Sequence, residues 1–313
     1  MQSVEAYQKE RAKTKLWRKM ARCWQLYLLL IPAVVYIFVF NYMPLYGIQI
    51  AFKKFSARKG YLGSPWVGFK YFERFFDSPD FWRLIKNTVS LSVYSLIVGF
   101  PLPIIMALML NQCSHGGFKK LVQNVIYAPH FVSMVVLVGM INVMFSVNSG
   151  VVNTVIEMLG GQRILFTGQA DCFPHMYVWS GVWQNMGWNS VIYFAALSSV
   201  SEDLHDAAIV DGANKWQRIL NIDLPTILPT ITIMLVLQIG QLMNVGFEKV
   251  FLMQNNLNLQ ASETIQTYVY KQGLLNADYG YSTAVGLFNN VINFVLLTTV
   301  NALTRRIGGS TLW

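Results

Sequence analysis

The sequence predicts an all-α membrane protein with six transmembrane helices, on three observations. Of its 313 residues, 54% are hydrophobic and only 12% are charged, whereas an ordinary soluble domain has about 25% charged residues. Six stretches approach the roughly 20 apolar residues that a bilayer-spanning helix needs. Inside them His130 is the only titratable residue apart from tyrosines, as the high cost of a buried charge requires. The expected spans are residues 24–42, 88–110, 121–145, 176–197, 227–245 and 284–303.

Basic residues set the expected orientation. Residues 1–23 form a tail rich in Lys and Arg, which predicts a cytoplasmic N-terminus resting on anionic lipid. The first span is long and lacks a small-residue cleavage site, so we expect it to be retained rather than removed as a signal peptide. Residues 24–313 then form the transmembrane domain, and an even number of spans returns Arg305 and Arg306 to the cytoplasm.

The loop 43–86 does not follow this charge pattern. It would face outward although it holds eight basic residues, which are Lys53, Lys54, Arg58, Lys59, Lys70, Arg74, Arg83 and Lys86. One interpretation is an electropositive mouth that attracts an acidic sugar or an acidic binding protein. The other is contact with anionic lipid headgroups.

A polar connection, residues 198–225, separates two very apolar stretches and would lie in the cytoplasm. Its apolar residues, Trp216 among them, recur at steps of three and four, which predicts short amphipathic helices. Gly212 would allow a turn between two such helices, and Leu224-Pro225 would end the second. By composition alone this connection could also be a helix that lies on headgroups.

The same connection reads Asp206-Ala207-Ala208, three residues, Gly212, nine residues, and Ile222-Asp223-Leu224-Pro225. This pattern resembles the EAA motif of ABC importer permeases, E-A-A-x3-G-x9-I-x-L-P, with Asp in place of the first Glu. The stretches "GSPWVGFKYFERFF", "YAPHFVSMVVLVGMI" and "ETIQTYVYKQGL" are similar to permeases of complex-carbohydrate importers, including those for alginate and pectin fragments. The resemblance covers most of the chain.

This resemblance implies a type I (MetI-like) permease fold with a cytoplasmic coupling helix, in the cytoplasmic (inner) membrane of a bacterium. It also implies a second, homologous permease subunit, two ATP-binding subunits that hold ATP and Mg, and an extracytoplasmic solute-binding protein. The pore would be a heterodimer or, as in some related importers, a homodimer. The residues expected at the contact with the ATPase are Asp206, Ala207, Ala208, Gly212, Trp216, Leu224 and Pro225.

The chain itself has no sign of a motor or of an enzyme. It contains no G-x-x-x-x-G-K-[ST] phosphate loop, so ATP hydrolysis would belong to separate subunits. It shows no catalytic triad or paired carboxylates, and Cys23, Cys113 and Cys172 have no metal-binding spacing. We therefore expect no cofactor on this chain and no nucleic-acid partner.

Polar and aromatic residues within the spans are the candidates for a transport path. Sugar rings stack on aromatic side chains, and sugar hydroxyls pair with uncharged amides. Gln238, Gln241 and Asn244 would share one face of the fifth span. Interhelical hydrogen bonds and an interfacial aromatic belt could also explain such residues. The candidates are Trp179, Trp183, Gln184, Asn185, Trp188, Asn189, Tyr193, Gln241, Asn244, Asn289 and Asn293.

His130 follows Pro129, and we interpret it as a neutral histidine at a kink or a membrane edge, since the spans hold no carboxylate to pair with it. Together these features predict the permease subunit of an ATP-driven ABC importer for an oligosaccharide, which the basic outer loop suggests could be acidic. A gradient-driven secondary transporter is the alternative, weakened by the missing carboxylates. A membrane scaffold without transport is a third interpretation.

Overall fold

The computed structural model describes residues 22–113 and 115–306, and the regular elements in these ranges are helices. The chain divides into two compact units, Met1–Val67 and Gly68–Trp313. Most of the basic tail 1–23 lies outside the described residues.

The first unit is dominated by one long apolar helical segment. It consists of α2 (Trp24–Ile37), a π-helical turn (Phe38–Tyr42) and a 3-10 helix (Met43–Phe52), followed by the short α3 (Gly60–Gly63). None of the residues of α2 is buried. A helix that is apolar on all sides needs an apolar solvent around it, as lipid would provide.

The second unit contains the remaining helices. In chain order they are α4 (Lys70–Phe76), α5 (Phe81–Gly99), α6 (Pro101–Asn111), α7 (Gly116–Tyr127), α8 (Met134–Met144), α9 (Val151–Met158), α10 (Cys172–Leu197), α11 (Glu202–Val210), α12 (Lys215–Arg218), α13 (Leu224–Ile239), α14 (Phe247–Met253), α15 (Leu259–Ser262), α16 (Ile265–Tyr270) and α17 (Tyr279–Arg306). Short 3-10 segments lie at Ala128–Phe131 and Phe166–Gly168, and π-helical segments at Ile219–Asp223 and Lys271–Leu275.

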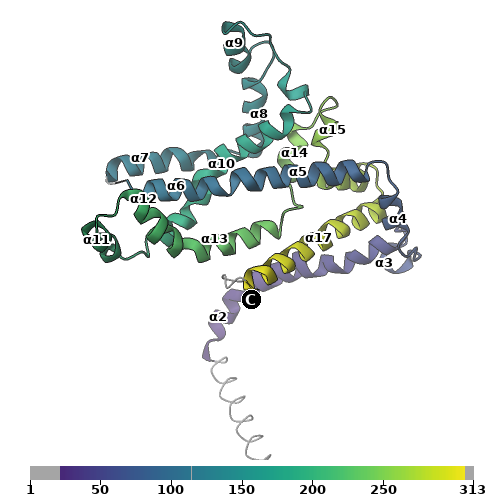
Figure 1. Cartoon of the computed structure of the whole chain (residues 1–313). Helices are drawn as coiled ribbons and strands as arrows, with labels where there is room; N and C mark the ends of the chain where they lie inside the picture. The colour runs from purple at the N-terminus through teal and green to yellow at the C-terminus, as the bar shows by residue number, and fades with distance from the viewer. Residues whose placement is uncertain (1–21, 114, 307–313) are drawn as a thin grey trace, which may run out of the picture. The chain divides into compact units, whose positions relative to one another are not determined.

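Helix α10 packs against α5, α6, α7 and α13, while α8 and α9 point away from this group (Figure 1). Three clusters of buried side chains hold the unit together. One joins α5, α8, α10 and α14 around Phe173 and Val250; a second joins α4, α5, α16 and α17 around Phe75 and Tyr281. The third, around Ile227, joins α6, α10 and α13.

Four helical segments of the described residues are long and apolar enough to cross a membrane: Trp24–Phe52, Phe81–Asn111, Lys215–Ile239 and Tyr279–Arg306. A fifth is counted if the bent pair Gly116–Phe131 and Met134–Met144 forms one span. The fourth expected span, 176–197, corresponds to α10, which is 26 residues long. It is not among the apolar segments, because its tryptophans and amides lower its hydropathy.

Two expected spans differ from the structure in shape. Residues 121–145 do not form one straight helix, since the chain bends by 99° between its two halves. Pro129 lies in the bend and offers no N–H, and Val132 and Ser133 are extended. The fifth expected span, 227–245, ends at Ile239. Gln241 and Asn244 therefore lie in a loop, and the expectation that they share a helical face with Gln238 is wrong.

Candidate functional site

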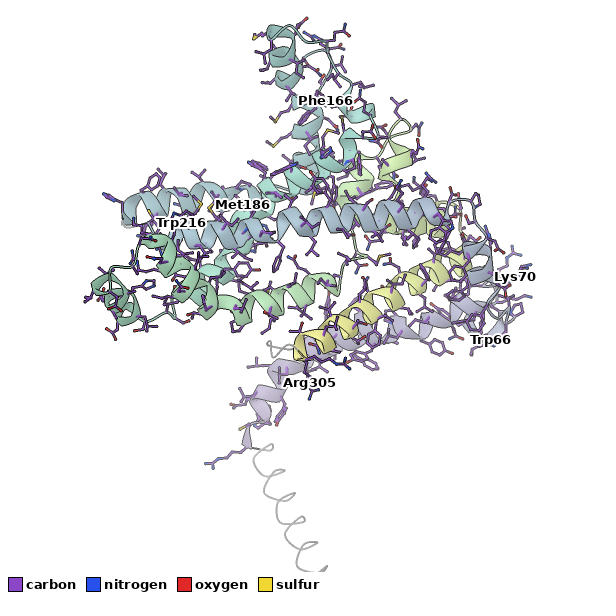
Figure 2. The ribbon with its side chains drawn as sticks, in the orientation of Figure 1. Trp66, Lys70, Phe166, Met186, Trp216 and Arg305 are labelled. Atoms are coloured by element: carbon purple, nitrogen blue, oxygen red, sulfur yellow. The ribbon has the colours of Figure 1, made fainter. Side chains whose placement is uncertain are left out.

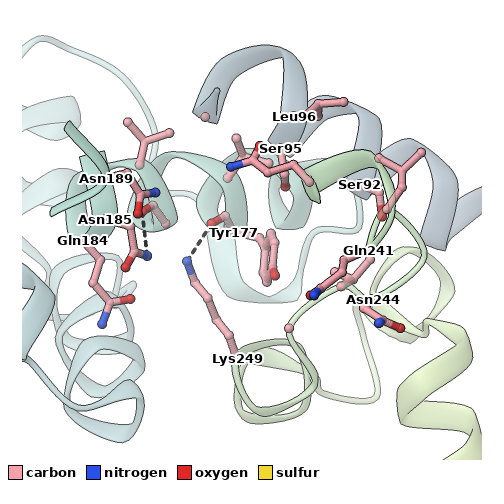
Figure 3. A pocket seen from close by; sticks show the side chains of 18 of the residues that line it. Ser92, Ser95, Leu96, Tyr177, Gln184, Asn185, Asn189, Gln241, Asn244 and Lys249 are labelled. Carbon is pink, nitrogen blue, oxygen red and sulfur yellow. Dashed lines mark hydrogen bonds between the residues drawn. The ribbon is translucent and has the colours of Figure 1, made fainter. Parts of the chain in front are cut away.

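A cavity of about 670 Å³ lies among α5, α10, the end of α13 and α14 (Figure 3). Most of its polar lining comes from uncharged side chains on three sides. Helix α10 brings Gln184, Asn185 and Asn189 to the cavity. Asn185 and Asn189 lie four positions apart and so share one face of the helix. Ser92 and Ser95 of α5 also line the cavity, as do Gln238, Gln241 and Asn244 from the C-terminal end of α13 and the loop that follows.

Five of the predicted path residues thus meet at one cavity, although they come from separate segments. Gln184 is buried and donates a hydrogen bond from Nε2 to the carbonyl of Val132 at 2.8 Å. Its Oε1 is buried and has no hydrogen-bond partner among the described residues. An amide oxygen in this position can accept a hydrogen bond from a ligand hydroxyl.

The cavity is also lined by charged side chains that are not among the expected path residues. Lys249 and Glu248, neighbours on α14, both line it. Lys249 is only 4% exposed, and its Nζ donates a hydrogen bond to the carbonyl of Tyr177 at 2.7 Å. Burial lowers the pKa of Lys249 to about 7. The sequence signal was a pair of charges, "EK", inside the apolar run "VGFEKVFLM" directly after a span.

The predicted aromatic residues lie outside this cavity. Trp179 and Trp183 line a separate, wholly apolar cavity of about 620 Å³ beside α8. Trp179 donates a hydrogen bond from Nε1 to the hydroxyl of Tyr94 at 3.1 Å. Trp188 and Tyr193 line a smaller cavity of about 200 Å³, which Asn189 and Gln238 share with the large polar one.

Asn289 and Asn293 lie behind the polar cavity rather than on its wall. Asn289 donates from Nδ2 to Oδ1 of Asn244 at 3.1 Å, and Asn293 accepts at Oδ1 from the backbone N–H of Met243 at 2.9 Å. Both residues are buried. They therefore hold the loop after α13 against α17, and so place Asn244 at the cavity.

His130 occupies the 3-10 segment inside the 99° bend. Its ring stacks on Trp188, with centroids 4.6 Å apart and planes 1° from parallel. Its Nδ1 is 3.0 Å from Oδ1 of Asn185. The histidine thus lies at a kink, as expected, and also orients a residue that lines the cavity.

The connection 198–225 contains two short helices, α11 and α12, as the periodicity predicted. Gly212 follows α11 with φ of 79°, a conformation that side chains disfavour. The N-terminus of α12 is closed by a capping box between Asn214 and Gln217. The positive φ explains why glycine occupies the turn.

Most residues of the EAA-like motif are open to solvent. Asp206, Ala207, Gly212 and Pro225 are exposed, and Ala208 and Leu224 are half-buried. Trp216 is 72% exposed on α12 (Figure 2). Exposed large apolar side chains such as Trp216 occur at contacts with other proteins and at contacts with lipid.

Asp223, the variable position of the motif, is fully buried where α13 begins. Its carboxylate accepts a hydrogen bond from Nε2 of Gln112 at 2.9 Å and pairs with Nε2 of His205 at 3.2 Å. Gln112 follows α6, and His205 belongs to α11. Asp223 therefore connects the polar connection to two long helices, a role that spacing alone did not reveal.

The basic residues of the loop 43–86 have different surroundings. Lys53 is 4% exposed and donates from Nζ to Gln49 and to the carbonyl of Tyr61. Arg74 pairs with Asp278 and Arg83 with Glu263, each at 2.7 Å. The exposed basic residues are Lys54, Arg58, Lys59, Lys70, Arg74 and Lys86. Lys54, Arg58 and Lys59 belong to the first unit, and Lys70, Arg74 and Lys86 to the second.

The described residues contain no group of three or more His, Cys, Asp or Glu that could hold a metal ion. The polar cavity presents amides, hydroxyls, one ammonium group and one carboxylate.

Residues 87–309 match the family model for the binding-protein-dependent transport system inner membrane component. The chain belongs to this family, whose members are membrane permease subunits of ABC transporters and not catalytic subunits. The resemblance inferred from the EAA-like motif is thus confirmed, together with the inner membrane as the location.

Individual relatives are similar over nearly their whole length. The chain is 43% identical to Protein LplB of Bacillus subtilis (strain 168), across 90% of this chain and 88% of that protein. It is 39% identical to the polygalacturonan/rhamnogalacturonan transport system permease protein YteP of the same strain, across 96% and 94%. A crystal structure of a bacterial alginate ABC transporter, in complex with an alginate pentasaccharide-bound periplasmic protein, contains a similar chain. That chain matches with a TM-score of 0.87, 38% identity, and coverage of 95% and 99%.

Proposed function

We propose that this chain is one of two permease subunits that form the path of an ATP-driven importer for an oligosaccharide. The observation that carries the proposal is the cavity of about 670 Å³ with its amide and serine lining. Uncharged hydrogen-bonding groups suit a solute with many hydroxyls. Relatives named for polygalacturonan, rhamnogalacturonan and alginate transport support a carbohydrate of more than one residue.

The proposed topology has six spans, with both termini in the cytoplasm. It takes α10 as the fourth span and the bent pair of α7 and α8 as the third. With 26 residues and no Asp, Glu, Lys or Arg, α10 exceeds the roughly 20 residues that a bilayer requires. The polar cavity beside α10 supplies the reason why a span would carry so many amides.

The connection with α11 and α12 would be the coupling element that docks on a cytoplasmic ATPase. Exposed Trp216 and the small residues Ala207 and Gly212 provide a surface for such contact. ATP and Mg would be bound by two ATPase subunits, and a second permease would close the open side of the cavity. A solute-binding protein outside the membrane would deliver the sugar.

The test is reconstitution of the complete importer in vesicles with a candidate oligosaccharide, its binding protein and ATP. We expect uptake that requires ATP and the binding protein, and two ATPase copies for two permeases by native mass spectrometry. Uptake that persists without ATP but follows an ion gradient would contradict the proposal. Purification of this chain alone in mild detergent would also count against it.

A further inference from the structure

Lys249 is a buried ammonium group without a carboxylate partner. None of the ion pairs within residues 22–113 and 115–306 includes it. Its contacts are the carbonyl of Tyr177 at 2.7 Å and the ring of the same tyrosine, 4.7 Å from the ring centroid. A neutral donor could satisfy that carbonyl without the large cost of burying a charge. The presence of a lysine rather than an uncharged donor at this position therefore calls for a further explanation.

The ammonium lies on the wall of the polar cavity, where the helix opposite leaves room for it. A Cβ at Gly181 of α10 would lie 3.2 Å from Nζ of Lys249, which is tighter than ordinary contact. In Figure 3 the Lys249 side chain reaches toward α10, between Gln184 and Asn185 on one side and Gln241 and Asn244 on the other. An anion in the cavity would thus meet a cation and several hydrogen-bonding amides together.

We propose that Lys249 is a specificity-determining residue that binds a carboxylate group of an acidic sugar as the sugar passes through the cavity. This inference rests on the proposed oligosaccharide import. An ammonium with one hydrogen bond to a carbonyl can still donate two more. The unpartnered Oε1 of Gln184 would accept a hydrogen bond from a sugar hydroxyl beside it.

Glu248 also lines the cavity and would oppose an anion there. No ion pair joins Glu248 to Lys249 among the described residues, so the ammonium group is left free of a carboxylate. The elements around α14 carry further titratable groups, which are Arg83, Lys86 and Tyr94 on α5, Cys172, His175, Tyr177 and Tyr193 on α10, and Tyr268 and Tyr270 on α16, whereas α8 has none. Of these only Tyr177 lines the cavity. Removal of the Glu248 charge should leave the preference for an acidic sugar unchanged or increase it.

The sign of the pH dependence follows from the lysine. Because burial lowers the pKa of Lys249 to about 7, the free ammonium loses its charge as the pH rises through that value. A bound carboxylate favours the charged form, so binding of the acidic sugar takes up a proton above pH 7. Its affinity should then fall by up to about tenfold per pH unit above pH 7, while a neutral sugar shows no such dependence.

The experiment compares a uronic-acid oligosaccharide with its carboxyl-reduced, neutral form in the reconstituted importer. For wild type and Lys249→Met we would measure the ratio of the two initial uptake rates with the same binding protein. We expect the ratio to fall about tenfold or more in Lys249→Met, with uptake of the neutral sugar maintained. Lys249→Arg keeps a positive charge, so its ratio of acidic to neutral sugar uptake should lie between those of Lys249→Met and wild type.

Lys119→Met is the matched control, because Lys119 also lies over an aromatic ring, that of Phe194 at 4.5 Å, but outside this cavity. It should leave the ratio unchanged. Equal slowing of both sugars by Lys249→Met would assign Lys249 to structural support and overturn the inference, as would an unchanged ratio. If the wild-type importer moved neither sugar, the proposed function itself would fail, and the inference with it.

Discussion

Gly187 lies where α10 crosses α7, and it is buried there. A Cβ at this position would overlap the carbonyl oxygen of Ile126, a backbone atom of α7 that cannot rotate away. The two helices can approach this closely only because residue 187 has no side chain, as is common where membrane helices pack. One missing methyl group thus sets the distance between two helices of the second unit.

We expect Gly187→Ala to destabilise the protein by about 1–3 kcal/mol, the usual cost of forcing extra volume into a packed interior. Thermal unfolding of the purified protein in detergent would show a lower midpoint. The matched control is Gly286→Ala in α17, where a Cβ would meet nothing within 4 Å. That change should be neutral or raise the midpoint, since alanine favours helices by about 1 kcal/mol over glycine. Equal midpoints for both variants would contradict the packing argument.

Among the elements, the polar connection is joined to the long helices through one buried carboxylate. Asp223 links His205 of α11 to Gln112 at the end of α6, and it lies at the start of α13. A displacement of α11 by an ATPase would therefore reach both α6 and α13 through Asp223. Because Asp223 is fully buried, its carboxylate and its partners could not form hydrogen bonds with water instead if these contacts were broken.

We expect Asp223→Ala to weaken the coupling of ATP hydrolysis to uptake and to cost about 1–3 kcal/mol, as for buried hydrogen-bonding groups that lose their partner. Asp223→Asn keeps acceptor capacity and should retain part of the coupling. A double-mutant cycle with His205→Ala measures the interaction directly, and we expect a coupling energy of about 0.5–3 kcal/mol for residues in contact. Strictly additive effects would show that His205 and Asp223 act separately.

The exposed residues of the same connection allow a separate test of ATPase association. We expect Trp216→Ala and Gly212→Asp to leave membrane insertion intact but to weaken ATPase association about tenfold or more. Gly212 has a φ of 79°, a backbone conformation in which a side chain costs about 1–2 kcal/mol. A loss of about 1.4 kcal/mol in binding free energy weakens the association constant tenfold. A Cβ at Gly212 would meet nothing within 4 Å in this chain, so added bulk would act on a docked partner.

Recovery of the ATPase with each variant from mild detergent is the measurement. Phe131→Ala is a suitable control for loss of an exposed aromatic residue, since Phe131 is 75% exposed but lies on a different segment. Normal recovery and normal uptake with Trp216→Ala would contradict a coupling role. Altered lipid binding alone would favour a helix on headgroups.

At the scale of the whole molecule, charge can act over distance on a solute that has not yet bound. Lys54, Arg58 and Lys59 are exposed, whereas Lys53 is buried among hydrogen-bond acceptors. In the proposed topology the three exposed residues face outward, where they would attract an acidic oligosaccharide or an acidic binding protein. Salt weakens such attraction, because the screening length is only about 10 Å at 0.1 M ionic strength.

We expect the triple change of Lys54, Arg58 and Lys59 to Gln to slow uptake of an acidic oligosaccharide several-fold at low salt and little at high salt. Uptake of the carboxyl-reduced, neutral sugar is the control. The triple change should slow its uptake only if the basic residues attract an acidic binding protein rather than the sugar itself. The same slowing at both ionic strengths would rule out steering and favour contact with lipid headgroups.

The class of the protein, the ends of α10 and α17 to within several residues, and the turn at Gly212 could be predicted from the sequence. These follow from composition, local periodicity and backbone preference, which depend on neighbours along the chain. The sequence also selected Gln184, Asn185, Asn189, Gln241 and Asn244, because an amide in an apolar segment needs a partner wherever the segment packs.

Which of these candidates share a cavity depends on how the helices pack in three dimensions. The 99° bend, the end of α13 at Ile239 and the folding back of α14 bring Lys249 to the amides of α10. The same packing places Trp179 and Trp183 at a separate apolar cavity. Sequence patterns could not reveal this, because the period of a helix defines which residues share a face but not which helix that face will meet.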